Sequence, residues 1–242
     1  MISLICVYND SRVFQDMSLS LAGQTAVHEL IGIDNTANRF PSAASALNHG
    51  ASTAQGDILI FLHQDILFHQ PWALQTISDG LTNLQRDAVL GLYGAGGDVV
   101  YGIEPTTPLT SAETLDECLI AMSRSTWQSF KFNEAVCDGW HLYAVELCLR
   151  ASASGCGIYQ MNGLPIEHLS TGEVNEQYMK TYKRLMNEYP EKKSIKTTCV
   201  SIPNNHSIFA VYHFMWRIKK TLLGNAPLRR NLRELLFRVT KR

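Results

Sequence analysis

Three carboxylates stand just after short apolar runs in the first part of the chain. Asp10 follows "ISLICVYN", Asp34 follows "HELIGI" and Asp65 follows "DILIFLHQ". Runs of this length that are rich in Ile, Leu and Val are typical of strands buried on both faces. Carboxylates gathered at one edge repel one another unless a cation or a hydrogen-bonding ligand joins them. Binding of a metal ion or a polar ligand is therefore the chemistry that these residues indicate.

Strand and helix patterns alternate around these residues. Apolar runs predict strands over residues 2–8, 28–35, 57–66 and 88–97, and helical spacing predicts helices over 11–24, 42–55 and 71–85. This alternation predicts an α/β fold with a mostly parallel central sheet flanked by helices. Ligands of such sheets bind beyond the carboxyl ends of the strands. Asp10, Asp34 and Asp65 are therefore expected at one binding edge.

The second half of the chain predicts further elements. A helix is expected over residues 139–154, with Gly155 near its C-terminus, and an amphipathic helix over 175–193. Between them, one or two strands within residues 156–172 lead to His168. The six cysteines form no Cys-x-x-Cys pair, which favours buried free thiols in a reducing compartment over disulfides or zinc.

Charge is divided unevenly along the chain. Residues 1–179 hold 6 Lys/Arg and 19 Asp/Glu, a charge of −13, whereas residues 180–242 hold 15 and 3, a charge of +12. The segment 216–242 alone carries a charge of +8 among Phe, Trp and Leu. This pattern fits a helix at an anionic membrane surface; a solvated helical extension or a homodimer contact are the alternatives. Nucleic acid is disfavoured because the body is acidic.

The N-terminus lacks a basic region followed by a long apolar one, and no run of about 18 apolar residues occurs. We therefore expect a cytoplasmic protein. The basic segment 216–242 leaves open a peripheral position at the inner face of the membrane.

Four stretches occur in a familiar order: "ISLICVYND", "IGIDNTAN", "ALNHGASTAQGDILIFLHQD", and "FNEAVCDGWHLYAVELCLRASASG" with "PIEHLSTG". Their order resembles the family 2 glycosyltransferases of the GT-A fold, and within them a branch that carries "HQD" in place of an Asp-x-Asp motif. The resemblance covers residues 1–175, and its third stretch is the most specific. It implies a GT-A domain over 1–175 and a basic helical extension over 176–242.

The resemblance also implies roles for individual residues. A nucleotide sugar would lie against Val7, Tyr8, Asp10, Asp34, Asn48, His63, Gln64 and Asp65. Asp65 and His168 would hold a divalent metal; a carboxylate oxygen suits Mg²⁺ or Mn²⁺, and an imidazole favours Mn²⁺. His63 would add a ligand or bind phosphate. Apart from the resemblance, Trp140 is a candidate to stack on an acceptor sugar, with a core aromatic as the alternative.

The chain departs from the family pattern at the catalytic base. The Glu-Asp pair expected before Leu-x-Arg falls on Tyr143 and Ala144, and Ala144 cannot accept a proton. On the expected helix, Asp138 and His141 lie three residues apart and share a face, so both are candidate bases. Glu146 is four residues before Arg150, and an ion pair between them is the favoured interpretation.

These observations predict a metal-dependent glycosyltransferase. Its donor would be a nucleotide sugar, UDP-linked by preference, and its acceptor a glycan or lipid-linked glycan in surface polysaccharide synthesis. The missing acid at residue 144 leaves an alternative, a catalytically inactive nucleotide-sugar-binding or regulatory protein of the same fold. A Rossmann-type enzyme is disfavoured because "VYNDSRVFQD" lacks the glycine-rich loop after the first strand.

Overall fold

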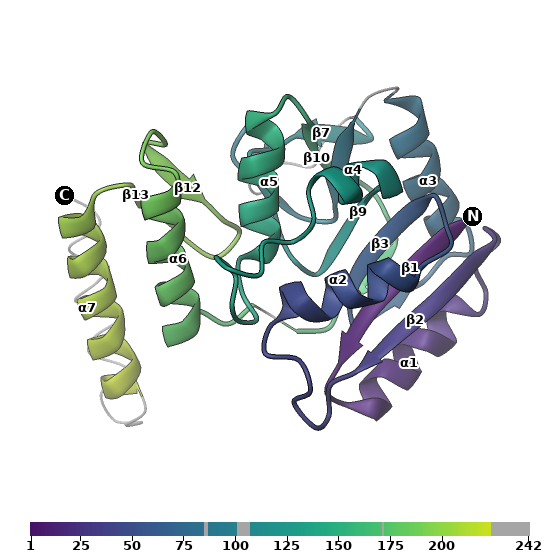
Figure 1. The fold of residues 1–242 in the computed structure, drawn as a ribbon, viewed down its shortest axis with the longest axis horizontal. Coiled ribbons are helices and arrows are strands. Elements are labelled where there is room, and N and C mark those ends of the chain that lie inside the picture. Colours follow the sequence, from purple (N-terminus) through teal and green to yellow (C-terminus); the bar gives the residue numbers. More distant parts are fainter. Residues whose placement is uncertain (85–86, 101–106, 171, 224–242) are drawn as a thin grey trace.

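Strands and helices alternate along most of the chain in the computed structural model, which describes residues 1–84, 87–100, 107–170 and 172–223 (Figure 1). The helices are α1 (Ser11–Leu21), α2 (Ala43–Thr53), α3 (Ala73–Asn83), α4 (Arg124–Ser129), α5 (Tyr143–Ala153), α6 (Glu176–Glu188) and α7 (His206–Leu223). The strands are β1 (Ile2–Tyr8), β2 (His28–Asp34), β3 (Ile58–His63), β4 (Ile66–Phe68), β5 (Ala88–Gly91), β6 (Gly94–Ala95), β7 (Leu109–Ser111), β8 (Thr114–Leu115), β9 (Leu119–Ser123), β10 (Gly157–Met161), β11 (Ile166–His168), β12 (Ser194–Lys196) and β13 (Ser201–Pro203).

A seven-stranded sheet in the order β2-β1-β3-β9-β5-β10-β7 forms the centre. The pairings β1–β2, β1–β3 and β5–β10 are parallel, and β9 and β7 run antiparallel to their neighbours. Five strands therefore share one direction and two oppose it, which confirms the expected mostly parallel α/β sheet.

Alternate side chains of the central strands pack on opposite faces of the sheet, as the twofold strand period requires. Ile5 of β1 packs with α2, α4 and α5, whereas Leu4 and Cys6 pack with α1 and α3. Close packing of α2 depends on Gly50, because a Cβ there would lie 2.6 Å from Ile5 Cγ2. The result is two helical layers around a buried sheet (Figure 1).

A third apolar cluster joins the C-terminal helices to the body. Val145 and Leu149 of α5 face Tyr182 and Leu185 of α6, and Phe209 of α7 stacks on Tyr182 with ring centroids 5.9 Å apart. Figure 1 accordingly shows α6 and α7 side by side at the end of the molecule remote from α1.

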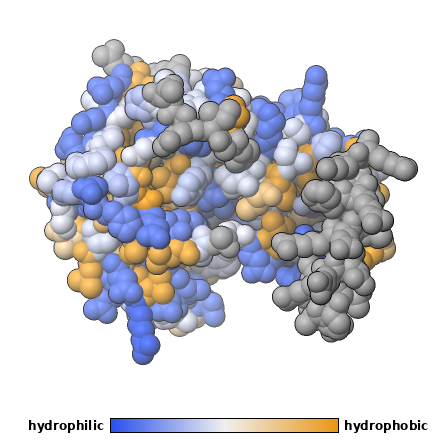
Figure 2. All heavy atoms as spheres, turned by 180° about the vertical axis from the view of Figure 1, so that it is seen from behind, coloured by the Kyte–Doolittle hydropathy of each residue, from blue (hydrophilic) through white to orange (hydrophobic). Residues whose placement is uncertain are grey.

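Much of the exposed surface of α7 is apolar, although Arg217 and Lys220 are exposed on it too. Its exposed side chains include Ile208, Val211, Tyr212, Phe214, Met215 and Ile218. In the described part of the chain, no helix combines the length and the hydropathy that crossing a bilayer requires. Figure 2 shows the rear face as separate apolar patches among hydrophilic residues, not as one continuous apolar surface.

Three predicted elements have different bounds in the structure. The expected strand over residues 57–66 is β3 and β4 with a turn between them, and the glycines after β5 form the short β6 instead of prolonging β5. The helix expected from residue 139 begins only at Tyr143, because Leu142 adopts a left-handed conformation with φ of 66°. Asp138 and His141 therefore lie in the preceding loop, and the prediction that they share a helix face was wrong.

Candidate functional site

The site is centred on the turn that ends β3. The register of β1 with its neighbours aligns Tyr8 with Asp34 and Val7 with His63, so the ends of three parallel strands form one edge. After the turn, β4 pairs antiparallel with β11, with His168 opposite Ile66. This pairing brings His168 beside Asp65, and the backbone of Leu169 donates to Asp65 O at 3.1 Å.

His63, Asp65 and His168 form a compact cluster. Each offers one ligand atom, and these three atoms lie within 4.8 Å of one another. His168 Nε2 is 3.4 Å from Asp65 Oδ1, and the two imidazole rings are 5.5 Å apart between centroids. A carboxylate with two imidazoles is a donor set for divalent transition metals. The cluster thus fits a divalent cation, and it places His63, for which the sequence left metal or phosphate binding open, beside Asp65 and His168.

The surroundings set the charge of this cluster. Burial would raise the pKa of Asp65, but hydrogen bonds from His168 and Ser170 and the neighbouring imidazolium charges hold that pKa well below its usual range. Burial, together with the charge of His168, lowers the pKa of His63. An ionised carboxylate and a neutral imidazole are the forms that bind metal.

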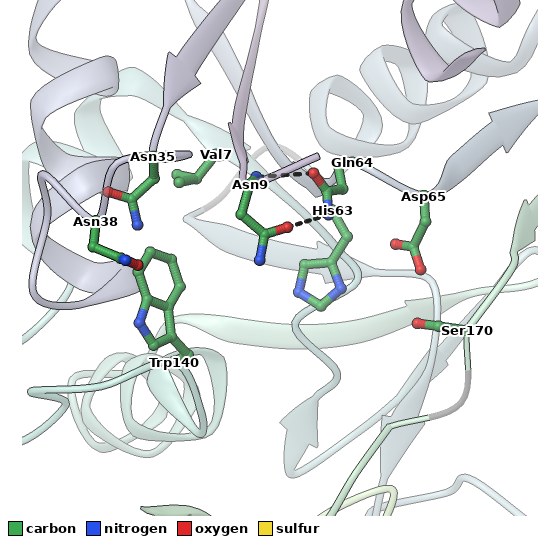
Figure 3. A pocket seen from close by; sticks show the side chains of 9 residues that line it. All are labelled: Val7, Asn9, Asn35, Asn38, His63, Gln64, Asp65, Trp140 and Ser170. Carbon is green, nitrogen blue, oxygen red and sulfur yellow. Dashed lines mark hydrogen bonds between the residues drawn. The ribbon is translucent and has the colours of Figure 1, made fainter. Parts of the chain in front are cut away.

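The cluster borders a cavity of about 350 Å³, within the size range of small-molecule sites. We call it the first pocket; its lining is Val7, Asn9, Asn35, Asn38, His63, Gln64, Asp65, Trp140 and Ser170. Figure 3 shows Asn35, Asn38 and Trp140 on one side, Asp65 and Ser170 on the other, and Asn9 with His63 and Gln64 between them. The arrangement places polar amides opposite the metal-binding cluster across one cavity.

Several residues predicted to bind the nucleotide sugar have structural partners. Gln64 Oε1 accepts from the N–H groups of Asn9 and Asp10 at 3.0 Å, and Gln64 Nε2 donates to Asn9 Oδ1 at 2.7 Å. Gln64 thus joins the β1 loop to the β3 turn. Asp10 caps α1 by accepting from Arg12 N and Val13 N, which gives it a structural task outside the lining of the first pocket.

Three more residues that were predicted to bind the nucleotide sugar, Tyr8, Asp34 and Asn48, also lie outside the lining of the first pocket. Tyr8 stacks on Phe14 at a centroid distance of 4.2 Å. Asp34 accepts from the N–H and the hydroxyl of Thr36, and these hydrogen bonds lower its pKa. Asn48 donates to Phe132 O and Glu134 Oε1 and accepts from Phe132 N. Its amide therefore ties α2 to the segment before α5.

A second pocket of about 260 Å³ adjoins the first, because His63, Trp140 and Ser170 line both. Its lining also includes His168, His141 and Glu117. Trp140 thus lies at the border between the two cavities. Of its surface, 38% is exposed, so its ring is accessible to a ligand from either pocket.

The two candidate bases are differently placed. Asp138 forms an ion pair with Arg184, whose hydrogen bond lowers the pKa of Asp138, and it lines neither pocket. His141 lines the second pocket, but its Nε2 lies 2.8 Å from the Asn175 amide nitrogen. Asn175 Oδ1 accepts from Tyr178 N, so Nδ2 is the atom that faces His141. The Nε2 lone pair of His141 is therefore already engaged.

Glu117 is a residue of the site that sequence reasoning missed. It lies between β8 and β9, beside the end of β3, and burial raises its pKa to about 8. In the described part of the chain, one buried side-chain polar atom lacks any hydrogen-bond partner, and it is Glu117 Oε1. Its neighbour Asp116 is fully engaged, with Cys118 N and with the Thr198 hydroxyl. Only the folded arrangement distinguishes these two adjacent acids.

Glu146 behaves as predicted. It is 1% exposed, and Arg150 binds it at 2.9 Å, four residues along α5. Asn133 and Tyr189 also donate to it. The favoured interpretation of Glu146 as a structural acid is confirmed.

No family model matches the sequence, and no curated protein matches it. Among solved structures, the chain is similar to S. aureus TarS 1–349 in complex with UDP-GlcNAc, at 15% identity and a TM-score of 0.51, covering 77% of this chain and 66% of that one. It is also similar to the mannosyltransferase PcManGT from Pyrobaculum calidifontis in complex with GDP-Man and Mn²⁺, at 13% identity and a TM-score of 0.57, covering 78% and 63%.

The chain spans less than two thirds of the length of these structures. At such low identity the likeness establishes the fold and nothing further. The GT-A-type fold expected from the resemblance is confirmed.

Proposed function

We propose that the protein is a glycosyltransferase that uses a nucleotide sugar, UDP-linked by preference, with Mn²⁺ or Mg²⁺. The observation that carries the proposal is the cluster of His63, Asp65 and His168 beside the carboxyl end of β3. His63 and Asp65 line the first pocket, which has the size of a ligand site, and His168 lines the adjoining second pocket. Supporting it, structures of the same fold contain UDP-GlcNAc or GDP-Man with Mn²⁺. Two imidazoles favour Mn²⁺ over Mg²⁺.

In this proposal, different residues of the two pockets bind the metal ion, the nucleotide sugar and the acceptor. His63, Asp65 and His168 would hold the ion, which when bound neutralises the charge of the departing diphosphate. Asn35 and Asn38 would bind the nucleoside side of the donor. Trp140, at the border of the pockets, would orient the acceptor sugar, which we propose is a glycan or lipid-linked glycan for surface polysaccharide synthesis.

The outer face of α7 supports placement at a membrane. Phe214, Met215 and Ile218 are exposed on it, and the segment 216–242 carries a charge of +8. We propose that this face lies on anionic lipid, so that the pockets meet a lipid-linked acceptor at the cytoplasmic surface.

An inactive nucleotide-sugar-binding protein is the second candidate. Two observations favour it: Ala144 offers no carboxylate at the position that the family pattern indicates, and the nearby Asp138 is paired with Arg184. It predicts donor binding without turnover.

A thermal-shift panel of UDP, GDP, CDP and TDP sugars, with and without Mn²⁺, tests the donor site. A ligand at about 100 times its dissociation constant adds roughly 2.7 kcal/mol to stability. We expect a shift that needs Mn²⁺ for one nucleotide in the wild type and disappears in Asp65→Ala. Asp57→Ala, an exposed acid at the other end of β3, is the control and should retain the shift. A folded wild type that responds to no nucleotide would contradict the proposal.

A further inference from the structure

We propose that Glu117 is the catalytic base, taking the proton from the acceptor hydroxyl in the second pocket, which makes that pocket the acceptor subsite. This inference rests on the proposed function and assigns the one role that the family pattern leaves vacant in this chain.

The position of Glu117 compensates for the lost acid. The residues that align with the family's Glu-Asp pair, Tyr143 and Ala144, begin α5. The backbone N–H groups of Leu142 and Tyr143 act to lower the pKa of Glu117, so its carboxyl lies near the N-terminus of the same helix, supplied by the β8–β9 connection. A carboxyl group is therefore present near the start of α5 although residues 143 and 144 supply none.

The chemical state of Glu117 suits a base. Its Oε1 is shielded from solvent and unpartnered among the described residues, so one oxygen remains to accept a proton. Burial raises its pKa to about 8, while the helix N–H groups act to lower it. A base is most effective when its pKa lies near the working pH. Asp138 and His141 lack this combination, because Asp138 is paired with Arg184 outside both pockets and Nε2 of His141 is engaged by Asn175.

The second pocket brings Glu117 into the same cavity as the metal cluster. His63 and His168 line it together with Glu117, and Trp140 closes its border with the first pocket. Tyr143 bridges His63 and the backbone of Glu117, since its hydroxyl lies 3.3 Å from His63 Nε2 and donates to the main-chain oxygen of Glu117 at 3.4 Å. An acceptor in this cavity would lie between the base and the donor.

Sugar transfer in this arrangement is a single displacement of the diphosphate by the acceptor hydroxyl. The acceptor oxygen forms a bond to the anomeric carbon of the sugar, and its proton passes to the Glu117 carboxylate. The bond from that carbon to the diphosphate breaks, and the nucleoside diphosphate leaves with the electron pair. Water in the second pocket would replace the acceptor in a slow hydrolysis by the same route.

Hydrolysis allows a test without knowledge of the acceptor. The full chain with Mn²⁺ is given each UDP and GDP sugar; donor affinity is measured by calorimetry, and nucleoside diphosphate release is followed. We expect Glu117→Gln to lower release by about 10²–10⁴-fold with donor affinity unchanged. The amide can still accept from Leu142 and Tyr143, so the melting temperature at pH 6 should be retained. Glu113→Gln, an exposed acid paired with Lys196 on the neighbouring connection, should leave release unchanged.

A second variant distinguishes loss of the base from misfolding. In Glu117→Ala, added formate should restore part of the release by replacing the carboxylate. Release in Glu117→Gln equal to that of the wild type, or loss in Asp138→Asn in its place, would overturn the assignment and leave the proposed function standing. A wild type that binds no donor would remove the proposed function, and this inference with it. Binding without release in the wild type would also overturn the assignment and favour the inactive alternative.

Discussion

At the scale of single residues, two carboxyl groups near the end of β3 have opposite electrostatic surroundings. Hydrogen bonds from His168 and Ser170 outweigh burial and keep Asp65 ionised, whereas burial raises the pKa of Glu117 to about 8, so that near neutral pH only a fraction of Glu117 is the carboxylate that accepts a proton. Acids whose surroundings separate their pKa values in this way commonly perform different tasks. Here they correspond to a metal ligand and a proton acceptor.

Stability should depend on pH through Glu117. Its pKa is raised from 4.5 to about 8 on folding, so between these values the unfolded chain has released a proton that the folded chain retains. Stability of the wild type therefore falls as pH rises through this window. Asp116 contributes to the shift, and His63 and His141 line the same cavity.

Glu117→Gln removes this titration. Urea unfolding at pH 5 and pH 8 should show the variant gaining stability relative to the wild type at the higher pH, up to roughly 5 kcal/mol. If the variant and the wild type differed in unfolding free energy by the same amount at pH 5 and at pH 8, the pKa of Glu117 would not be raised by folding.

At the scale of elements, one acid anchors α7 to the start of α6. Glu176 binds Arg217 at 2.6 Å and His213 at 3.0 Å, and the hydrogen bond from Arg217 lowers its pKa to about 2. The buried Phe209 completes this contact. These contacts hold one side of α7 against the body and leave the opposite side exposed to solvent.

Glu176→Gln should loosen α7. Amide hydrogen exchange at pH 7 is expected to show lower protection across α7 in the variant, by a small margin, because exposed ion pairs contribute less than about 1 kcal/mol. Because folding lowers the pKa of Glu176, its ion pairs stabilise the folded protein above about pH 4.5, and this stabilisation is lost as the pH falls towards about 2. The difference between the wild type and Glu176→Gln should therefore shrink over that window. Equal protection at pH 7 would show that apolar packing alone holds α7.

At the scale of the whole molecule, an acidic body with a charge of −13 precedes a segment with a charge of +12. The body would be repelled from an anionic surface while the C-terminal part is attracted, which orients the protein on that surface. The apolar outer face of α7 lies where the basic segment begins.

Binding to vesicles tests this orientation. The full chain should sediment with vesicles that contain anionic lipid and remain free with neutral ones, and added salt should weaken binding because it screens exposed charges. Phe214→Ser with Met215→Ser should reduce binding. Leu19→Ser with Val27→Ser, equally exposed but remote from α7, should not. Concentration-dependent dimers that the Phe214 and Met215 changes abolish, without vesicle binding, would show a second copy as the partner.

The sequence by itself determined the features that depend on local periodicity. The apolar runs predicted the strands of the sheet, their polar ends predicted the binding edge, and a spacing of four residues predicted the pair of Glu146 with Arg150. These follow from the geometry of a single strand or helix. Tertiary structure decided which distant segments lie together: the pairing of β4 with β11 that brings His168 to Asp65, and the placement of Glu117 near the start of α5. Such contacts depend on how whole elements pack, and the left-handed Leu142 that ends the loop before α5 has no signal in the residue pattern.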